Sequence, residues 1–232
     1  MRSPLLCLLA LLPALCGSAF SQTKPVTRSE ALAIAEHYRL FEWTPARKNI
    51  FHGRDPDGIL VNTPDAGYNA PGHRPGWWEA GKVNVGMPYK WGGFNSLEGF
   101  KEGLEKGFYA GDVYTREKRR LLDAAVSKYT IGIDCSGLIS RCWKLDRSFS
   151  TRKLPALCVP LASYADLKPG DVLNSNNNHV VLFCQFTDAT QQRLLAYEAG
   201  SPPSWKVQLD DIPVAMLQEQ GYQPFRYRKM KD

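Results

Sequence analysis

The stretch GIDCSGLISRCW, residues 132–143, decides how the rest of this chain is interpreted. Its apolar positions recur at the i, i+3, i+4 and i+7 spacing of one helix face, namely Cys135, Leu138, Ile139 and Cys142. Asp134 precedes this face and is a typical N-cap residue. Cys135 is therefore predicted in the first turn of a helix, where free backbone N–H groups and the helix dipole stabilise a thiolate.

The helix by itself leaves two interpretations of Cys135 open. Its place at a helix start favours a nucleophile, but free cysteines are among the most buried residue types, so a core thiol is the alternative. Cys142, two turns later, lacks this setting and is predicted to lie in the core. A thiolate nucleophile needs a base within hydrogen-bond reach. His179 begins the apolar run HVVLFCQF, and Glu198 lies in the next run between apolar neighbours, where a carboxylate needs a partner. These three residues can form a Cys-His-Glu array, in which His179 is the base for Cys135 and Glu198 orients His179.

The distribution of helix and strand patterns predicts an α+β fold. Residues 27–40 open with Thr27 and carry Glu30 three positions later, which is a capping box before a helix. Residues 41–78 are rich in turn formers and are expected to form a long irregular arm. Residues 96–130 predict two helical pieces, with a solvated basic cluster at 118–120. After residue 165, short β-branched runs divided by turn residues predict an antiparallel sheet.

Two segments, DCSGLISRCW and LKPGDVLNSNNNHVVLF, resemble the NlpC/P60 cysteine peptidases, which have a papain-like fold with the nucleophile helix packed on an antiparallel sheet. The resemblance implies that Cys135 is the nucleophile, His179 the base and Glu198 the group that orients the base. The family often has histidine at this third position, so Glu198 is a departure from its pattern.

A third segment, GMPYKWGG at residues 86–93, is similar to a family element whose tyrosine lies beside the nucleophile. The resemblance implies that Tyr89 lies next to Cys135 and contributes to substrate binding or to an oxyanion site. Asp134 and Ser136, which flank the nucleophile, are implied as substrate-recognition residues, and Asp134 is alternatively only a helix cap.

The resemblance covers about residues 83–93 and 133–200. We therefore divide the chain into a signal peptide (1–21), an N-terminal helix with an irregular arm (22–82) and a catalytic domain (83–232) that carries a helical insertion at 94–130. Family members usually have a far shorter segment at this point, so the insertion and the arm are expected to roof the groove and to change the substrate.

The first residues have the pattern of an export signal. Arg2 precedes a short apolar run that ends in small residues before Gln22, so the protein is expected to be secreted or periplasmic, with a short membrane anchor as the alternative. No later run approaches the length of a membrane span. The net charge of +6 favours anionic surroundings such as a cell wall or nucleic acid without choosing between them.

The cysteines that follow the signal do not form a disulfide framework. A bond between Cys142 and Cys158 and a fully reduced, buried set both remain open, and Cys184 is expected in the core on the strand face opposite His179. The chain has no C-x-x-C motif and the histidines show no ligand spacing, so no metal and no cofactor is expected.

The resemblance to the NlpC/P60 peptidases, together with the Cys-His-Glu order, implies a cysteine hydrolase that cleaves an amide bond, most specifically in peptidoglycan stem peptides, through a thioester acyl-enzyme. The expected partner is cell-wall peptide, with no nucleic acid and no membrane span after signal removal, and the oligomeric state is open. One alternative is an acyl-lipid hydrolase or acyltransferase, with an apolar wall built by aromatic residues of the insertion: Phe94, Phe100, Phe108 and Tyr109. Another alternative is a non-catalytic wall-binding protein.

Overall fold

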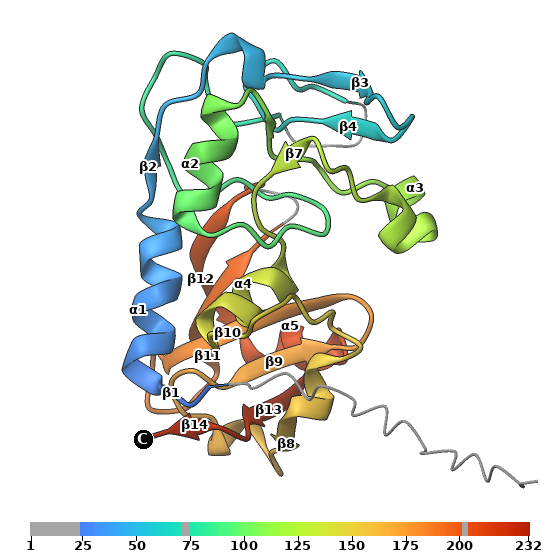
Figure 1. The fold of residues 1–232 in the computed structure, drawn as a ribbon. Coiled ribbons are helices and arrows are strands. Elements are labelled where there is room, and N and C mark those ends of the chain that lie inside the picture. The colour runs from blue at the N-terminus through green and yellow to red at the C-terminus, as the bar shows by residue number, and fades with distance from the viewer. Residues whose placement is uncertain (1–23, 71–74, 201–203) are drawn as a thin grey trace, which may run out of the picture.

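The computed structural model describes residues 24–70, 75–200 and 204–232, and the expected signal peptide lies outside them. In these ranges the fold is mixed α+β, with five α-helices and one six-stranded antiparallel sheet (Figure 1). The predicted α+β class is confirmed. The described residues form two regions: a sheet region, which holds the large sheet with α1, α4 and α5, and a cap region, residues 41–70 and 75–131, which lies above it in Figure 1.

The large sheet has the strand order β12-β11-β10-β9-β13-β8, and every neighbouring pair is antiparallel. Its strands are β8 (Cys158–Pro160), β9 (Val172–Ser175), β10 (His179–Phe186), β11 (Arg193–Ala199), β12 (Val207–Pro213) and β13 (Gln223–Tyr227). The antiparallel sheet expected after residue 165 is confirmed, and β8 adds an edge strand from an earlier segment. Outside the sheet, β1 (Val26–Thr27) pairs in parallel with β14 (Met230–Lys231).

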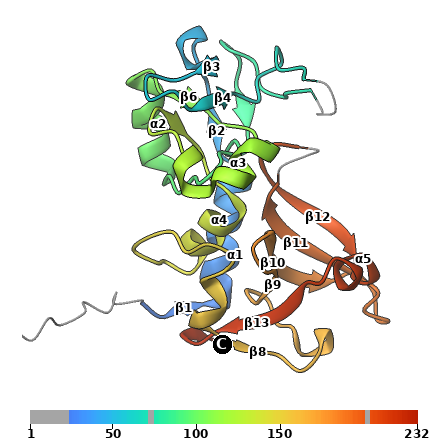
Figure 2. The same ribbon diagram turned by 90° about the vertical axis from the view of Figure 1, so that its right-hand side faces the viewer.

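Helices cover both faces of this sheet (Figure 2). On one face lie α1 (Arg28–Arg39), capped by the predicted Thr27–Glu30 box, and α4 (Cys135–Cys142), which contacts β10 and β11. On the other face α5 (Val214–Glu219) packs against β12. Val180 and Leu182 of β10 therefore belong to the core under α4, and Val181 and Phe183 belong to the core under α5. This alternation is the period of two that a strand buried on both faces requires.

The cap region is built from short elements. Its strands form the pairs β2 (Glu42–Trp43) with β5 (Asn84–Val85), β3 (His52–Arg54) with β4 (Leu60–Asn62), and β6 (Tyr109–Ala110) with β7 (Thr130–Ile131). Its α-helices are α2 (Leu97–Glu105) and α3 (Arg116–Leu121). Two 3₁₀ turns, η1 (Arg47–Asn49) and η2 (Leu122–Ala125), also lie in the described part of this region, and η3 (Leu154–Leu157) and η4 (Tyr164–Asp166) lie in the sheet region.

Two sequence expectations for the cap region were wrong. The arm is not simply irregular, because residues 41–78 contribute β2 and the β3–β4 hairpin. The expectation of a solvated cluster at 118–120 was wrong for Lys118, which is 1% exposed and whose ammonium group bonds Asp112, whereas Arg120 is exposed as expected. A lysine is buried in this way only when a counter-charge and hydrogen bonds replace its water.

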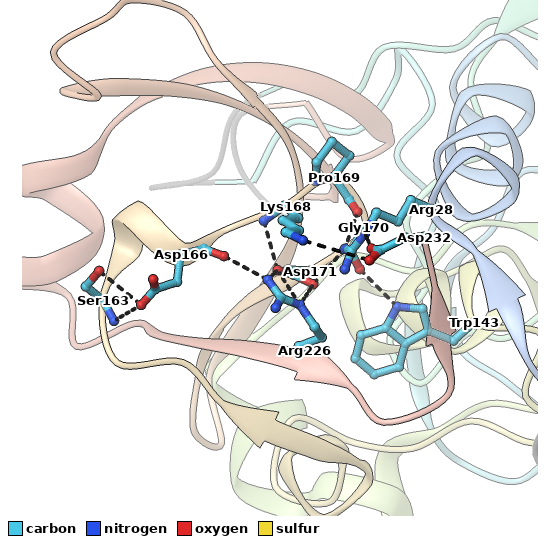
Figure 3. A network of polar contacts seen from close by, with 10 residues as sticks. All are labelled: Arg28, Trp143, Ser163, Asp166, Lys168, Pro169, Gly170, Asp171, Arg226 and Asp232. Atoms are coloured by element: carbon cyan, nitrogen blue, oxygen red, sulfur yellow. Dashed lines mark hydrogen bonds and ion pairs between the residues drawn. The ribbon is translucent and has the colours of Figure 1, made fainter.

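A buried carboxylate fastens the start of α1 to the sheet (Figure 3). Asp171, at the end of the LKPGD turn, accepts hydrogen bonds from Arg226 of β13 at 2.6 Å and from Arg28 at 3.1 Å. The same turn is closed by the backbone N–H of Lys168, which donates to the Asp171 carboxylate at 2.9 Å. The turn is thereby fixed at the point where β9 begins, and β9 in turn sets the position of β10.

The described cysteines are free thiols: Cys135, Cys142, Cys158 and Cys184. Cys142 is fully buried as predicted, and Cys184 packs against the core on the predicted strand face but is only partly buried. Over residues 24–70, 75–200 and 204–232, no helix is both long enough and apolar enough to cross a membrane.

Candidate active site

Cys135 occupies the first turn of α4, as the sequence predicts. Asp134 is the N-cap, and its Oδ1 accepts hydrogen bonds from the Gly137 N–H at 2.6 Å and from the Ser136 hydroxyl at 2.9 Å. Burial raises the pKa of Asp134, although these hydrogen bonds favour its ionised form. The side chain is therefore occupied by its own helix, which agrees with the interpretation of Asp134 as a cap.

The segment that contains Tyr89 runs beside the residues just before Cys135. The Ile133 N–H donates to Pro88 O at 3.1 Å, and the Lys90 N–H donates to Ile133 O at 3.0 Å. Tyr89 is 4% exposed, and burial, followed by the nearby Cys135, holds its pKa well above the usual value. The phenol consequently stays protonated and can donate a hydrogen bond next to the thiol.

Two glycines allow this close approach. The Asp134 N–H donates to Gly93 O at 3.1 Å, and a Cβ on Gly137 would lie 2.0 Å from the same oxygen. A Cβ on Gly93 would lie 2.6 Å from Gly132 O. Any larger residue would push the α4 N-terminus away from the Tyr89 segment, so glycine at both positions has a packing reason.

His179 is the first residue of β10 and pairs with Glu198 of β11. Its Nε2 lies 2.7 Å from Glu198 Oε2, which leaves Nδ1 for the thiol of Cys135. Burial alone would lower the pKa of His179, but the charge and hydrogen bonding of Cys135, and then of Glu198, raise it to about 10. The pKa of Glu198 is lowered, because the interaction with His179 outweighs burial. This environment favours a protonated His179 imidazole between the ionised Glu198 and the Cys135 thiol, an order of groups that suits a cysteine nucleophile and its base.

The second oxygen of Glu198 has partners that sequence reasoning missed. Gln208 of β12 donates from Nε2 to Glu198 Oε1 at 2.9 Å, and the same nitrogen bonds Asp210. The alternation of Gln208 and Asp210 on a strand would have placed both on one face. Only the pairing of Gln208 opposite Glu198 shows which face that is.

The array opens into a cavity of about 570 Å³. The sequence-predicted site residues that line it are Tyr89, Asp134, Cys135, Ser136, His179 and Glu198. Lining residues that the sequence did not predict come from the insertion, the loop before η3, β12 and α5. They include Arg119, Leu122, Asp123, Val126, Arg152, Asp210, Met216 and Leu217. All six predicted residues thus meet at one cavity, although they come from four separate parts of the chain: residue 89, residues 134–136, residue 179 and residue 198.

The insertion contributes a wall of this cavity, but with other residues than expected. Arg119, Leu122 and Val126 line it, and Leu122 O accepts a hydrogen bond from Trp91 Nε1 at 3.2 Å. None of the aromatic residues proposed for an apolar wall is among the lining residues. They pack elsewhere: Phe100 is buried against Trp43, Phe94 lies under Arg141, Phe108 joins the main core and Tyr109 stacks on Phe51.

A buried ion pair anchors this wall to the arm. Lys118 Nζ lies 2.6 Å from Asp112 Oδ2, and Asp112 Oδ1 accepts from the Asn62 N–H at 3.2 Å. Burial raises the pKa of Asp112 to about 6 even with Lys118 beside it. The position of α3 therefore depends on a charge pair whose members are both removed from water.

No protein-family model matches this chain, and no curated protein matches it. Among the described residues, no group of three or more His, Cys, Asp or Glu side chains is arranged to hold a metal ion.

Proposed function

We propose that this protein is a cysteine hydrolase of NlpC/P60 type, with a papain-like arrangement of nucleophile helix and sheet, that cleaves an amide bond in peptidoglycan stem peptides. The observation that supports it most is the meeting of Cys135, His179 and Glu198 at one cavity, with Cys135 at a helix N-terminus. Export by residues 1–21 to the periplasm or the exterior belongs to this proposal, because the substrate is found there.

The roles of the three residues follow from their contacts. His179 Nδ1 takes the proton of the Cys135 thiol, while its Nε2–H donates to Glu198. The thiolate attacks the amide carbonyl carbon, and the negative charge that develops on oxygen is stabilised by the Cys135 backbone N–H and the Tyr89 phenol. The C–N bond then breaks as the imidazolium gives its proton to the leaving amine, which leaves a thioester on Cys135.

Water completes the cycle. His179 takes a proton from a water molecule, and the oxygen attacks the thioester carbon. The C–S bond breaks, the carboxylic acid product leaves, and the thiolate–imidazolium pair is restored. The net reaction is amide plus water to acid plus amine, with no other reactant.

The test is mass spectrometry of soluble products after incubation with intact peptidoglycan and with defined muropeptides. Wild-type protein is expected to release fragments whose masses identify the cleaved bond, and Cys135→Ala is expected to release none. Cys184→Ser, which changes a thiol outside the cavity, is the matched control and should cleave like wild type. Absence of fragments with wild-type protein would contradict the peptidoglycan assignment.

The reactivity of Cys135 tests the catalytic assignment without any substrate. Because His179 lies beside the thiol and can take its proton, Cys135 is expected to react with iodoacetamide at pH 6 faster in wild-type protein than in His179→Ala. Equal rates for the two proteins at pH 6 would favour the alternative of a non-catalytic wall-binding protein.

The acyl-lipid alternative now depends on a different set of apolar residues. Leu122 and Val126 of the insertion and Met216 and Leu217 of α5 line the cavity. Release of fatty acid from phospholipid vesicles, with no release from muropeptides, would favour this alternative over a wall peptidase.

A further inference from the structure

A second carboxylate, Asp210, lies beside the Cys-His-Glu array. In the β11–β12 register, Gln208 stands opposite Glu198 and Asp210 stands opposite Ala196. Asp210 is therefore the diagonal neighbour of Glu198 on the same face of the sheet, within reach of a polar side chain. It also lines the cavity, so a molecule that enters the site can reach it.

One amide nitrogen holds the two carboxylates together. Gln208 Nε2 lies 2.9 Å from Glu198 Oε1 and also bonds Asp210 Oδ2. The other oxygen of Glu198 bonds His179 at 2.7 Å. Gln208 and Asp210 of β12 therefore hold Glu198 in its orientation toward the imidazole. Their hydrogen bonds go to Glu198 and to each other, and not to Cys135.

Two carboxylates this close do not ionise independently. Burial, and then the hydrogen bond and charge of Glu198, raise the pKa of Asp210 to about 7, whereas the pKa of Glu198 is lowered. Below neutrality Asp210 therefore carries a proton that it can donate to Glu198. Above neutrality both groups are charged and repel each other, and Glu198 loses this donor.

The other charged groups around Asp210 are distributed over several elements. His179 of β10 favours the ionised form of Asp210 by its charge. The insertion and the loop before η3 place Arg119, Asp123 and Arg152 on the cavity, and α4 places Asp134 and Cys135 there. The cavity residues from α5 are uncharged. Among these charged groups, Glu198 is the one that is hydrogen-bonded to Asp210, and this bond depends on whether Asp210 carries a proton.

We propose that Asp210, together with Gln208, is a positioning residue of this site: its protonated carboxyl donates to Glu198 and fixes it against His179, and loss of that proton weakens the array. This inference rests on the proposed catalytic assignment of Cys135, His179 and Glu198, but it does not depend on which substrate is cleaved. It predicts that the reactivity of Cys135 has a dependence on pH near neutrality that originates in Asp210.

The experiment compares the rate of Cys135 alkylation by iodoacetamide in wild-type protein and in Asp210→Asn between pH 6 and pH 8, with the modified peptide quantified by mass spectrometry. Asparagine keeps a donor toward Glu198 and cannot ionise. The ratio of the two rates, variant over wild type, is expected to rise about fivefold over this range, since a hydrogen bond to a charged group is worth about tenfold in an equilibrium.

Three further variants separate positioning from a general structural effect. Asp210→Ala and Gln208→Ala remove a partner of Glu198 and should slow alkylation at pH 6 about tenfold. Asp211→Asn changes the neighbouring exposed residue, which bonds Arg193 on the far side of the strand, and its rate ratio to wild type should not vary with pH. Circular dichroism of each variant checks that the fold is kept.

The outcomes divide cleanly. A ratio for Asp210→Asn that is constant with pH, or that falls as pH rises, overturns the role of Asp210 while leaving the proposed hydrolase unaffected. Absence of muropeptide cleavage by wild-type protein would instead contradict the proposed substrate, and because alkylation needs no substrate, a rising ratio would still support the positioning role.

Discussion

The sheet region and the cap region are held together in different ways. In the sheet region, β9 to β13 are joined by backbone ladders between two apolar cores, with one register shift between β10 and β11 at residues 183–185. In the cap region the paired strands are two or three residues long, and buried side chains bridge the backbone instead. Asn49 Nδ2, for example, donates to Leu104 O at 3.1 Å and to Phe108 O at 2.8 Å, and the Ser127 hydroxyl donates to Asp55 at 2.6 Å.

This difference has a consequence for mutation. A backbone ladder survives the replacement of any one side chain, because its bonds are made by groups that every residue carries. A segment held by buried polar side chains loses its attachment when one of them is removed, and the partner left behind is costly. The cap region should therefore be the more sensitive to single polar substitutions, although the proposed chemistry lies mostly in the sheet region.

The largest expected effect sharpens the comparison on its chemical side. Cys135→Ala removes the nucleophile but leaves α4 packed on the sheet, so hydrolysis of muropeptides should fall by at least about 10³-fold. The free energy of unfolding, measured in guanidinium chloride, should change far less. If Cys135→Ala cleaved at the wild-type rate, Cys135 would not be the nucleophile, and the active site would have to lie outside the sheet region.

The second prediction tests the sensitivity of the cap region. Lys118→Met leaves Asp112 buried without its bonded cation and should lower the free energy of unfolding by about 3–5 kcal/mol. Arg226→Met is the matched change in the sheet region, where Asp171 keeps Arg28, and it should cost less. Equal losses in chemical denaturation would break the comparison.

The loss in Lys118→Met should also depend on pH. The pKa of Asp112 is raised to about 6 with Lys118 present, and it rises further when the cation is removed. A carboxyl whose pKa is higher in the folded state destabilises the fold as pH rises between the unfolded and folded values. The deficit relative to wild type should therefore be larger at pH 8 than at pH 5, and a smaller deficit at pH 8 would contradict the assignment.

A third prediction compares one glycine from each region. Gly137→Ala places a Cβ 2.0 Å from a backbone oxygen of Gly93, so α4 must shift, at a cost of about 3 kcal/mol. Gly99→Ala in α2 meets a serine side chain at 3.2 Å, and alanine favours the helix, so its cost should be much smaller. Thermal denaturation followed by circular dichroism compares the two, and a Gly137→Ala protein as stable as Gly99→Ala would show that α4 can move freely.

The smallest expected effect tests whether the cap region contributes to binding. Leu122→Ala removes an apolar lining residue of the cavity and should raise KM about threefold to tenfold while kcat is largely kept. Leu121→Ala is the control, because Leu121 is 45% exposed and does not line the cavity. If KM changed in both variants, or in neither, the Leu122 side chain would have no specific part in substrate binding.

Local signals in the sequence predicted several features that the structure confirms. Thr27 and Asp134 cap helices where the sequence places them, because a cap depends on residues within one turn of each other. His179 begins β10 and Glu198 lies in β11 for a similar reason, since each strand is marked by its own run of apolar residues. The catalytic roles of Cys135, His179 and Glu198 stay predictions.

The second helix of the insertion shows where local patterns stop being sufficient. Its apolar spacing continues to Val126, yet α3 ends at Leu121 and Leu122 takes a positive φ of 52°. The Leu122 carbonyl then bonds Trp91, and Val126 packs close to Gly92. These contacts join residues about thirty positions apart in the chain. Tertiary contacts of this kind override the local preference of residues 122–126 for an α-helix.

By itself, then, the sequence determined the helix caps, the strand content and the position of Cys135 at a helix start, since each depends on neighbouring residues. The tertiary structure decided that Gln208 and Asp210 stand beside Glu198, that Lys118 is buried, and which insertion residues line the cavity. These facts depend on strand register and on burial, which bring together residues far apart in the chain, and no local pattern records which partner each side chain meets.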